Sequence, residues 1–553
     1  MLRWIADTRD YLEDLAKASL QVLVGSLVAL VGLSLAIFTL YAQPPLFIIE
    51  CAAVIAVAIV GVGINHVIKQ LRTIYPSLRY TEALGSARMG SRKDLVQAKL
   101  LDGEATHIYC GLKDREPVYY KGKRHLMTLG PTRSGKDTAL LVPNLHRLKR
   151  SVIVIDPKGE LAAITARYRK RFGHVVIFDP FGELRRLGLS HRSDGYNPFA
   201  IPGFNVRDRE FYSQAISHAE SVVNLERTNE VHFPERGRDL FAACDMRSKW
   251  LEHEGKGPST MRRINAMLRA RGEMFRKVID DIAQHSYKPM AQLLSHFPED
   301  DREVNSVIAT VHGQTRFLND EVILDDMDKH PKIDGKPFDF EMLKHQIITV
   351  YVILPENRLS THAVWLRLIV ASALDALTRS GPGPIVPLLI INEAGNLGRL
   401  DALTRAMGMV AGRGLTLWTL WQTLAHLPKT YGAEGLEDFL QGAAVLNSFR
   451  ANDNRTAEYL SARLGDQTVK VKSYNLNKEA KASGQGISPQ GHALRHPNDL
   501  LGLEDGRILS WIEPSSRAFE LDAPGYWDLG LKGLDPNPYF KPEPARRYAK
   551  RTS

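Results

Sequence analysis

A glycine-rich loop at residues 130–137 (GPTRSGKD) constrains the fold of this chain more than any other feature. It follows a short apolar run at 124–130 and precedes a stretch of helical character at 138–148. A loop placed between a strand and a helix in this way is a P-loop: its glycines let backbone N–H groups approach phosphates, and the helix dipole adds positive potential. We therefore predict a nucleotide site in an α/β fold, with Lys136 bridging the β- and γ-phosphates. The residues predicted to bind the nucleotide are Gly130, Pro131, Thr132, Arg133, Ser134, Gly135, Lys136, Asp137 and Thr138.

Other β-branched apolar runs agree with this fold class. They lie at 151–156, 174–179, 346–354, 386–391 and 415–421. Strands that alternate with helical stretches predict a parallel sheet covered on both faces by helices. Residues 206–330 differ, because they have few β-branched runs and show helical apolar spacing, for example within 262–284. We predict that this segment is an all-α domain inserted into the α/β domain.

A site that hydrolyses nucleotide also needs a base for the attacking water. The run at 386–391 ends at Asn392 and Glu393, and Glu393 is the predicted group that polarises water. Gln422, after the run at 415–421, is either a sensor of the γ-phosphate or a surface polar residue. Arg413 is either an arginine finger that acts across a subunit boundary or an arginine that pairs locally.

Two apolar stretches near the N-terminus predict a membrane hairpin. Residues 22–41 carry no charge, and residues 46–68 carry one acid, Glu50. Each stretch is long enough to cross a hydrocarbon core of about 30 Å as a helix. The short connection between them has no Lys or Arg, whereas several basic residues follow the second stretch. The positive-inside rule therefore places both termini in the cytoplasm.

The charge of the chain favours an anionic partner, either nucleic acid or a lipid surface. Its formal net charge is +10, and no helix-turn-helix or zinc-finger signature appears. Contact with DNA would then be sequence-independent and would rest on the phosphate backbone. The three cysteines, Cys51, Cys110 and Cys244, lie far apart, which argues against a disulfide framework or a zinc site.

Several short motifs occur in a fixed order along the chain. They are GSAR at 85–88, GPTRSGK at 130–136, DPKGE at 156–160, NEAGNLG at 392–398, the strand before Gln422, and Asn452-Asp453 followed by TAEY at 456–459. With this ordered set, from about residue 80 to 520, the chain resembles the coupling proteins of type IV secretion and conjugation systems. These TraG-like proteins are hexameric relatives of the FtsK/HerA-type P-loop translocases.

The resemblance implies a RecA-like P-loop NTPase that binds ATP and Mg²⁺ and assembles as a homo-hexamer in a bacterial inner membrane. It also implies that the protein passes DNA, relaxase–DNA or effector proteins to the components of a secretion channel. The expected domains are the transmembrane hairpin at 1–70, a nucleotide-binding domain in two parts at 71–205 and 331–540, the all-α domain at 206–330, and a basic tail at 541–553. A chromosome-partition translocase is disfavoured by the large helical insertion.

Two positions near the expected magnesium ion depart from the family's pattern. Asp137 stands where a Ser or Thr hydroxyl normally binds the metal, and Asn392 stands where a strand-end Asp is usual. We hypothesise that the carboxylate has moved across the site, so that Asp137 supplies the charge that Asn392 lacks, and both are predicted to border the metal. The alternative is a membrane docking receptor that binds nucleotide without hydrolysing it.

Overall fold

The computed structural model describes residues 84–201, 204–225, 232–295, 297, 301–408, 414–475 and 484–539. Its contacts divide the chain into two compact units, residues 1–88 with 464–494 and residues 89–463 with 495–553. The predicted membrane hairpin, Arg413 and the basic tail at 541–553 lie outside the described residues. Over the described ranges, no helix combines the length and the apolar character needed to cross a membrane.

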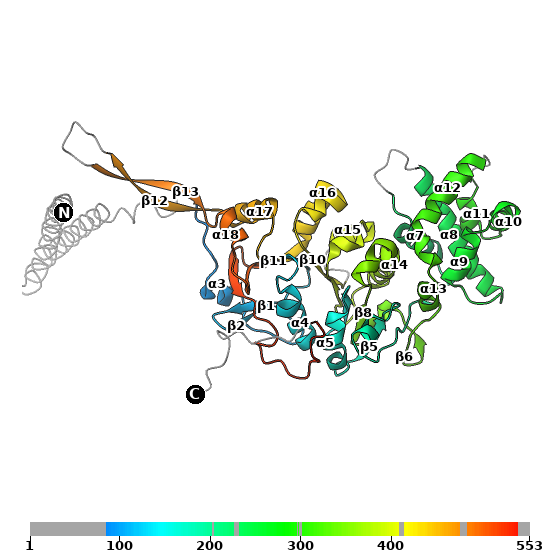
Figure 1. The fold of residues 1–553 in the computed structure, drawn as a ribbon, viewed down its shortest axis with the longest axis horizontal. Helices are drawn as coiled ribbons and strands as arrows, with labels where there is room; N and C mark the ends of the chain where they lie inside the picture. Colours follow the sequence, from blue (N-terminus) through cyan, green and yellow to red (C-terminus); the bar gives the residue numbers. More distant parts are fainter. Residues whose placement is uncertain are drawn as a thin grey trace, which may run out of the picture. The chain divides into compact units, whose positions relative to one another are not determined.

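The larger unit is built on one sheet of eleven strands (Figure 1). Their order across the sheet is β2-β1-β15-β14-β11-β3-β10-β9-β4-β8-β5. The strands are β1 Ile108–Lys113, β2 Glu116–Tyr120, β3 His125–Leu129, β4 Val152–Ile155, β5 His174–Phe178, β8 Ile348–Val352, β9 Leu388–Ile391, β10 Thr416–Trp421, β11 Ala443–Ser448, β14 Arg507–Ile512 and β15 Ala518–Asp522.

The part of the sheet from β11 to β5 is parallel, as the sequence predicts. Strands β4, β9 and β10 are buried along their whole length, because helices cover both of their faces. All six apolar runs identified from the sequence are strands of this parallel part. The P-loop strand β3 lies between β11 and β10, so the ends of β3, β10, β9 and β4 meet at one edge.

The parallel arrangement predicted from the sequence does not extend to the other edge of the sheet. Strands β14, β15, β1 and β2 pair antiparallel with their neighbours. The hairpin β1–β2 turns through Asp114 and Arg115, both with positive φ (51° and 68°), which is the geometry of a two-residue type I′ turn. Neither residue is a glycine, so the sequence lacks the usual signal for this turn.

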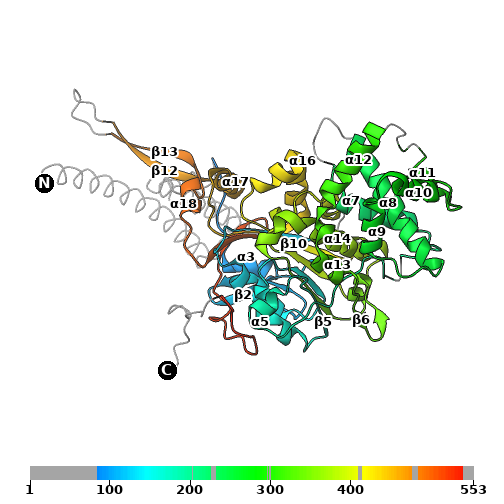
Figure 2. The same ribbon diagram turned by 45° about the vertical axis from the view of Figure 1, so that its right-hand side comes forward.

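Helices cover both faces of the sheet (Figures 1 and 2). On one side lie α4 (Val142–Arg147) and α5 (Glu160–Arg169), whose apolar residues join the main hydrophobic core with β4, β9 and β10. On the other side lie α14 (Glu356–Arg379), α15 (Asp401–Gly408) and α16 (His426–Gly442). The remaining helices of this unit's α/β part are α3 Arg92–Gln97, α6 Glu183–Arg186, α17 Asn454–Leu464 and α18 Pro497–Leu501.

The described elements within 206–330 are all helical. They are α7 Phe211–Val222, α8 His232–His253, α9 Met261–Leu268, α10 Gly272–Ala283, α11 Lys288–Leu293, α12 Asp301–Gln314, the 3-10 helix η3 Arg316–Asn319 and α13 Glu321–Met327. The apolar spacing at 262–284 belongs to two helices, because the chain leaves helical geometry before Gly272, whose φ is +54°. Two short strands follow, β6 Lys332–Ile333 and β7 Lys336–Pro337, before the 3-10 helix η4 Phe340–Lys344.

The smaller unit contains a long hairpin of β12 (Asp466–Asn475) and β13 (Gly484–Ala493). Gly85, from the first of the ordered motifs, lies against the base of this hairpin, where its carbonyl accepts a hydrogen bond from Thr468 N at 3.1 Å. A side chain at Gly85 would bring its Cβ to 2.2 Å from the carbonyl oxygen of Asp466. The close approach of two backbones explains the glycine at this position.

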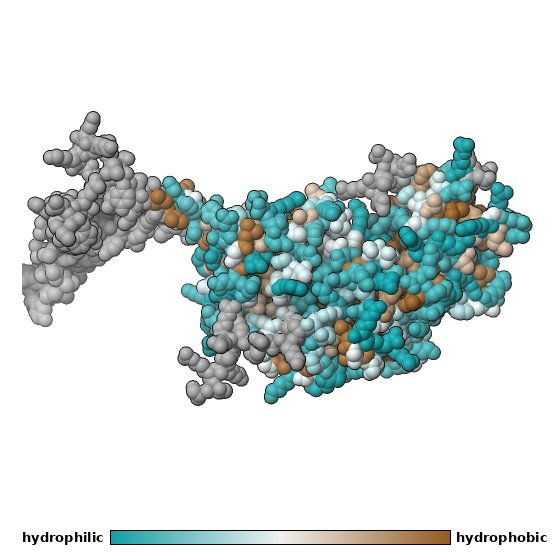
Figure 3. Space-filling model, in the orientation of Figure 1, coloured by the Kyte–Doolittle hydropathy of each residue, from teal (hydrophilic) through white to brown (hydrophobic). Residues whose placement is uncertain are grey.

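The visible surface of the described part is mostly hydrophilic, with hydrophobic residues scattered across it (Figure 3). Scattered apolar residues are ordinary on a protein surface and carry no functional signal by themselves.

Candidate nucleotide site

The P-loop has the strand–loop–helix context that the sequence predicts. Gly130 N donates to the carbonyl oxygen of Trp421 at 2.9 Å, which joins the start of the loop to the end of β10. Gly135 has φ +88°, a conformation that side chains rarely tolerate, and its carbonyl accepts the N–H of Ala139 at 2.8 Å. After Lys136 the chain forms a π-helical turn, η2 (Asp137–Leu141), which continues into α4. The first N–H groups of this helix therefore face the loop, where they can bind phosphate.

Lys136 and Glu393 come together at the edge of the sheet. Glu393 follows β9 in a left-handed conformation (φ 60°, ψ 55°), and its Oε1 lies 3.8 Å from Lys136 Nζ. Both side chains are nearly buried, at 6% and 10% exposure. Left-handed geometry in a residue other than glycine costs about 1–3 kcal/mol and is found most often at functional sites. The strain places the glutamate directly opposite the P-loop lysine.

The second oxygen of Glu393 has a different partner. Asn396 Nδ2 donates to Glu393 Oε2 at 2.9 Å from the short 3-10 helix η5 (Ala394–Leu397). Asn396 therefore orients the carboxylate of Glu393. Sequence reasoning missed this role of Asn396. Its position three residues after Glu393 in the NEAGNLG motif is the only signal that points to it.

The two predicted magnesium residues present oxygen atoms without partners. Asp137 Oδ1 and Asn392 Oδ1 are buried and have no hydrogen-bond partner among the described residues, and the same holds for Ser134 Oγ. Orphaned buried oxygens are costly unless a ligand or water satisfies them. The described residues hold no cluster of three or more His, Cys, Asp or Glu side chains suited to a metal ion. This donor set fits Mg²⁺, which is usually held by one or two protein oxygens together with nucleotide phosphates and water.

Thr138, the alternative hydroxyl at this position, is engaged in its own loop. Its Oγ1 donates to the carbonyl oxygen of Gly135 at 3.2 Å. Its own carbonyl accepts the N–H of Tyr526 at 2.9 Å. The hydroxyl of Thr138 is therefore engaged by the backbone of the P-loop.

Gln422 lines the same pocket as Glu393. This pocket has a volume of about 340 Å³ and opens beside the end of β10. The neighbouring turn is fastened to a later motif, because Leu424 N donates to Thr456 Oγ1 at 3.1 Å. Asp453 in turn accepts the N–H of Thr456 at 2.9 Å. The pocket is lined by Glu393, Gly395, Asn396, Gln422, His426, Lys429 and Thr430.

The DPKGE motif after β4 completes this edge of the sheet. Ile155 pairs with Ile391, so the motif begins level with Asn392. Burial raises the pKa of Asp156 to about 8, and the nearby carboxylates of Asp137 and Glu160 act in the same direction. Burial likewise raises the pKa of Glu160, with Asp137 adding to the effect. These shifts place Asp156 and Glu160 within electrostatic range of the predicted metal residue, a proximity that the sequence alone did not assign.

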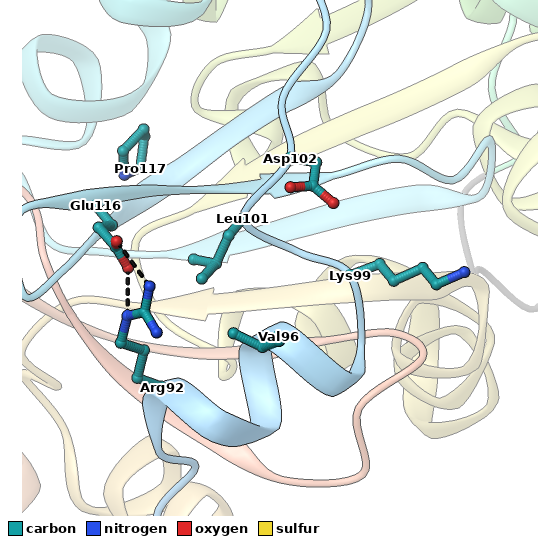
Figure 4. Close-up of a pocket in the computed structure, with 7 residues that line it drawn as sticks. All are labelled: Arg92, Val96, Lys99, Leu101, Asp102, Glu116 and Pro117. Carbon is teal, nitrogen blue, oxygen red and sulfur yellow. Dashed lines mark hydrogen bonds and ion pairs between the residues drawn. The ribbon is translucent and has the colours of Figure 1, made fainter.

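A second hollow, of about 400 Å³, lies between α3 and β2 (Figure 4). An ion pair spans one end of it, with Arg92 Nε 2.6 Å from Glu116 Oε2. None of the predicted site residues lines it, and its walls mix both signs of charge.

The fold and the loop at Gly130–Lys136 together are those of a P-loop protein. The chain belongs to the family described as type IV secretory system conjugative DNA transfer, whose sequence model matches residues 79–513. The family membership predicted from the ordered motifs is thereby confirmed.

Individual relatives agree with this assignment. The chain is 25% identical over 492 residues to protein VirD4 of Rhizobium rhizogenes, covering 86% of this chain and 70% of that protein. It is 25% identical over 432 residues to the conjugal transfer protein TraG of Escherichia coli, covering 70% of this chain and 64% of that protein.

Solved structures of the conjugative coupling protein TrwB share the fold. The trigonal form in complex with sulphate superposes with a TM-score of 0.60 at 16% identity, covering 83% of this chain and 97% of that one. TrwB in complex with ADP and Mg²⁺ gives a TM-score of 0.59 at 16% identity, with the same coverage of 83% and 97%. The likeness confirms a mixed α/β fold with a large parallel sheet.

Proposed function

We propose that this chain is an inner-membrane coupling protein that uses ATP to pass DNA, relaxase–DNA or protein substrates to a type IV secretion channel. The observation that carries the proposal is the nearly buried ion pair of Lys136 and Glu393, whose Nζ and Oε1 lie 3.8 Å apart at the edge of the sheet where the strand ends converge. A phosphate-binding lysine and a base for water are the two groups that nucleotide hydrolysis needs from the protein. The role in transfer to a secretion channel is inferred from the family to which the chain belongs.

In this proposal each site residue has a role. The loop of Gly130 to Thr138 binds the phosphates, and Lys136 bridges the β- and γ-phosphates. Glu393 polarises the attacking water, Gln422 senses the γ-phosphate from the same pocket, and Arg413 acts across a subunit boundary. TrwB has been solved with ADP and Mg²⁺ and with an ATP analogue, which supports the same cofactors here. Asp137 and Asn392 would hold the Mg²⁺ ion, which compensates the phosphate charge during transfer.

The arrangement in the cell extends the proposal. The hairpin at 1–70 anchors the chain in the inner membrane, and both termini face the cytoplasm. Residues 71–205 and 331–540 form a RecA-like motor domain, 206–330 form the all-α domain that meets substrate, and 541–553 form a basic tail. Six copies form a ring around the DNA. The net charge of +10 supports contact with the phosphate backbone, so DNA binding should weaken steeply with salt.

A second candidate is a docking receptor that binds nucleotide without turning it over. Asn392 favours it, because an amide beside the metal carries no charge to hold Mg²⁺. Glu393, held between Lys136 and Asn396, favours the motor.

The deciding experiment measures ATP hydrolysis by the full-length chain purified in detergent, with and without DNA. Lys136→Ala and Glu393→Gln variants test the site, and Lys277→Ala is a matched control, since Lys277 is an exposed lysine that pairs with Glu273 in the all-α segment. Turnover that rises with DNA and is lost in both site variants supports the motor. Nucleotide binding without turnover, at protein concentrations high enough for ring assembly, supports the docking receptor instead.

A further inference from the structure

Lys158 lies in a turn beside the nucleotide site. The turn follows β4, whose last residue pairs with the residue that precedes Asn392. Asp156 Oδ2 accepts the N–H of Ala162 at 2.8 Å, and Gly159 adopts φ +66° as the chain enters α5. Asp156 is buried, whereas the side chain of Lys158 keeps 36% exposure. The turn is therefore fixed at its base, and its lysine side chain is partly exposed.

One carboxylate contacts this lysine, and two others attract it from a distance. Lys158 Nζ lies 3.4 Å from Oε1 of Glu356, the first residue of α14, and Glu393 and Asp137 attract it from further away. Partial burial disfavours the charged lysine, but these carboxylates outweigh it and raise the pKa of Lys158. Lys158 is therefore a cation within electrostatic range of both the predicted base and the predicted metal residue.

The C-terminal segment 535–539 fastens the turn from outside. Tyr539 Oη donates to the carbonyl oxygen of Lys158 at 2.6 Å, and Asn537 Nδ2 donates to Glu160 Oε1 at 2.6 Å. Two residues earlier, Asp535 N donates to the carbonyl oxygen of Ile164 at 3.0 Å on α5. These contacts span more than 350 positions of sequence and converge on one short turn. The segment holds the backbone of the turn without occupying the lysine side chain.

We propose that Lys158 is a second phosphate-binding cation of the nucleotide site. When a nucleoside triphosphate is bound, Lys158 breaks its ion pair with Glu356 and binds the terminal phosphate. The segment 535–539 holds the turn that carries Lys158 in position. This inference rests on the proposed function, because it needs nucleotide at the P-loop.

The charges explain why a second cation is needed. In the proposed function the phosphates draw Lys136 away from Glu393, and the glutamate then stands beside the anionic terminal phosphate without its resting partner. A cation in addition to Lys136 and Mg²⁺ lowers the repulsion between these two anions. Lys158 is a flexible point charge that can exchange partners, which a planar arginine fork does less readily. When a triphosphate is bound, Lys158 exchanges Glu356 for the terminal phosphate and so balances the added negative charge. A diphosphate has no terminal phosphate for Lys158, which then stays paired with Glu356.

The test compares the affinity of the full-length chain for a non-hydrolysable ATP analogue and for ADP, each with Mg²⁺. Lys158→Ala should weaken binding of the analogue roughly 10- to 100-fold, as expected for loss of one charge-assisted hydrogen bond, and leave ADP binding unchanged. Lys158→Arg should restore part of the preference for the triphosphate. Lys277→Ala should change neither affinity.

Two further variants leave the lysine in place. Glu356→Gln removes the resting partner of Lys158 and should strengthen binding of the analogue but not of ADP. Tyr539→Phe removes one hydroxyl and should weaken the preference for the triphosphate by a smaller factor, with Tyr212→Phe, at an exposed tyrosine of α7, as its control. Equal losses for both nucleotides, or an unchanged ratio in Lys158→Ala, would overturn the inference. A parent chain that binds both nucleotides but hydrolyses none would refute the motor, while the affinity ratio would still decide the role of Lys158.

Discussion

Lys136 and Glu393, which lie 257 positions apart in the sequence, form an ion pair with Nζ 3.8 Å from Oε1 in a nearly buried site. The two groups proposed to act on a nucleotide neutralise one another in this arrangement. In the proposed function, bound phosphates compete for the lysine, and nucleotide binding releases the glutamate to polarise the attacking water. The ion pair thus gives the site a resting state in which neither charge is left unpaired.

The first prediction concerns stability of the nucleotide-free protein. Glu393→Gln leaves Lys136 charged and nearly buried without its partner, which should cost roughly 1–3 kcal/mol. The melting temperature should therefore fall without nucleotide and recover in part when ATP and Mg²⁺ are added, because the phosphates replace the lost carboxylate. Thermal melts of parent and variant with and without nucleotide check this. An unchanged melting temperature without nucleotide would show that the pair is not formed.

The second prediction concerns the two unusual residues near the metal. Asp137→Ser and Asn392→Asp each alter the local charge by one unit, in opposite directions, and each should lower turnover at limiting Mg²⁺ by roughly tenfold. The double variant restores the usual distribution of ligands and should recover most of the activity. A double-mutant cycle of turnover against Mg²⁺ concentration measures the coupling. Additive losses would show that the two positions do not share one ion.

The parallel core of the fold and the P-loop could be predicted because both leave a local trace in the sequence. Buried parallel strands require continuous apolar runs, and the loop before Lys136 places a glycine at position 135, where φ is +88°. The antiparallel edge of the sheet was missed because it leaves no such local trace in the sequence. The turn at Asp114 and Arg115 uses positive φ without glycine, and tertiary pairing of β1 with β15 stabilises it.

The candidate site was predicted in part for the same reason. Lys136 and Glu393 lie in recognisable motifs that follow strands, whereas the role of Asn396 depends on the strained turn that Glu393 begins. Contacts from residues 535–539 to the Lys158 turn could not be predicted, because no pattern near the C-terminus marks what that segment packs against. Long-range contacts between polar side chains leave no periodicity to read.

The third prediction concerns the pH dependence of stability. Burial raises the pKa of Asp326 to about 6, with Asp179 and Asp194 adding to the effect and Ser193 and Lys329 opposing it. The unfolded chain would have a pKa of about 3.9, so the folded state binds this proton more tightly. The stabilising contribution is therefore complete below about pH 4 and is lost as the pH rises through 6.

Replacement of this acid should remove that dependence. Asp326→Asn is expected to be more stable than the parent by on the order of 2 kcal/mol at pH 8, with little difference at pH 4. Asp325→Asn is the matched control, since Asp325 is exposed and pairs only at the surface with Arg262. Denaturation midpoints of the three proteins at pH 4, 6 and 8 check this, and a constant difference between parent and Asp326→Asn would contradict it.

The last prediction concerns Arg367, which connects the helical segment to the turn after Glu393. Arg367 lies on α14 with 8% exposure and donates to the carbonyl oxygens of Ser221 on α7 and Leu397 on η5, at 3.3 and 3.4 Å. Tyr431 holds the next carbonyl of the same turn, because its hydroxyl donates to Gly398 O at 3.2 Å. Movement of α7 can therefore reach the strained backbone of Glu393 through one buried side chain.

Arg367→Met keeps the length of the side chain but leaves both carbonyls without their donor, at a cost of about 1–3 kcal/mol in stability. Because a small displacement of a catalytic group is expensive, turnover should also fall by about tenfold while nucleotide affinity is unchanged. Arg262→Met is the matched control: Arg262 is 41% exposed and pairs with three surface acids, so its loss should alter stability by less than about 1 kcal/mol and leave turnover intact. Steady-state kinetics with nucleotide titrations separate the two effects. A stability loss in Arg367→Met without any loss of turnover would mean that the arginine only packs α14 against α7 and does not support the position of Glu393.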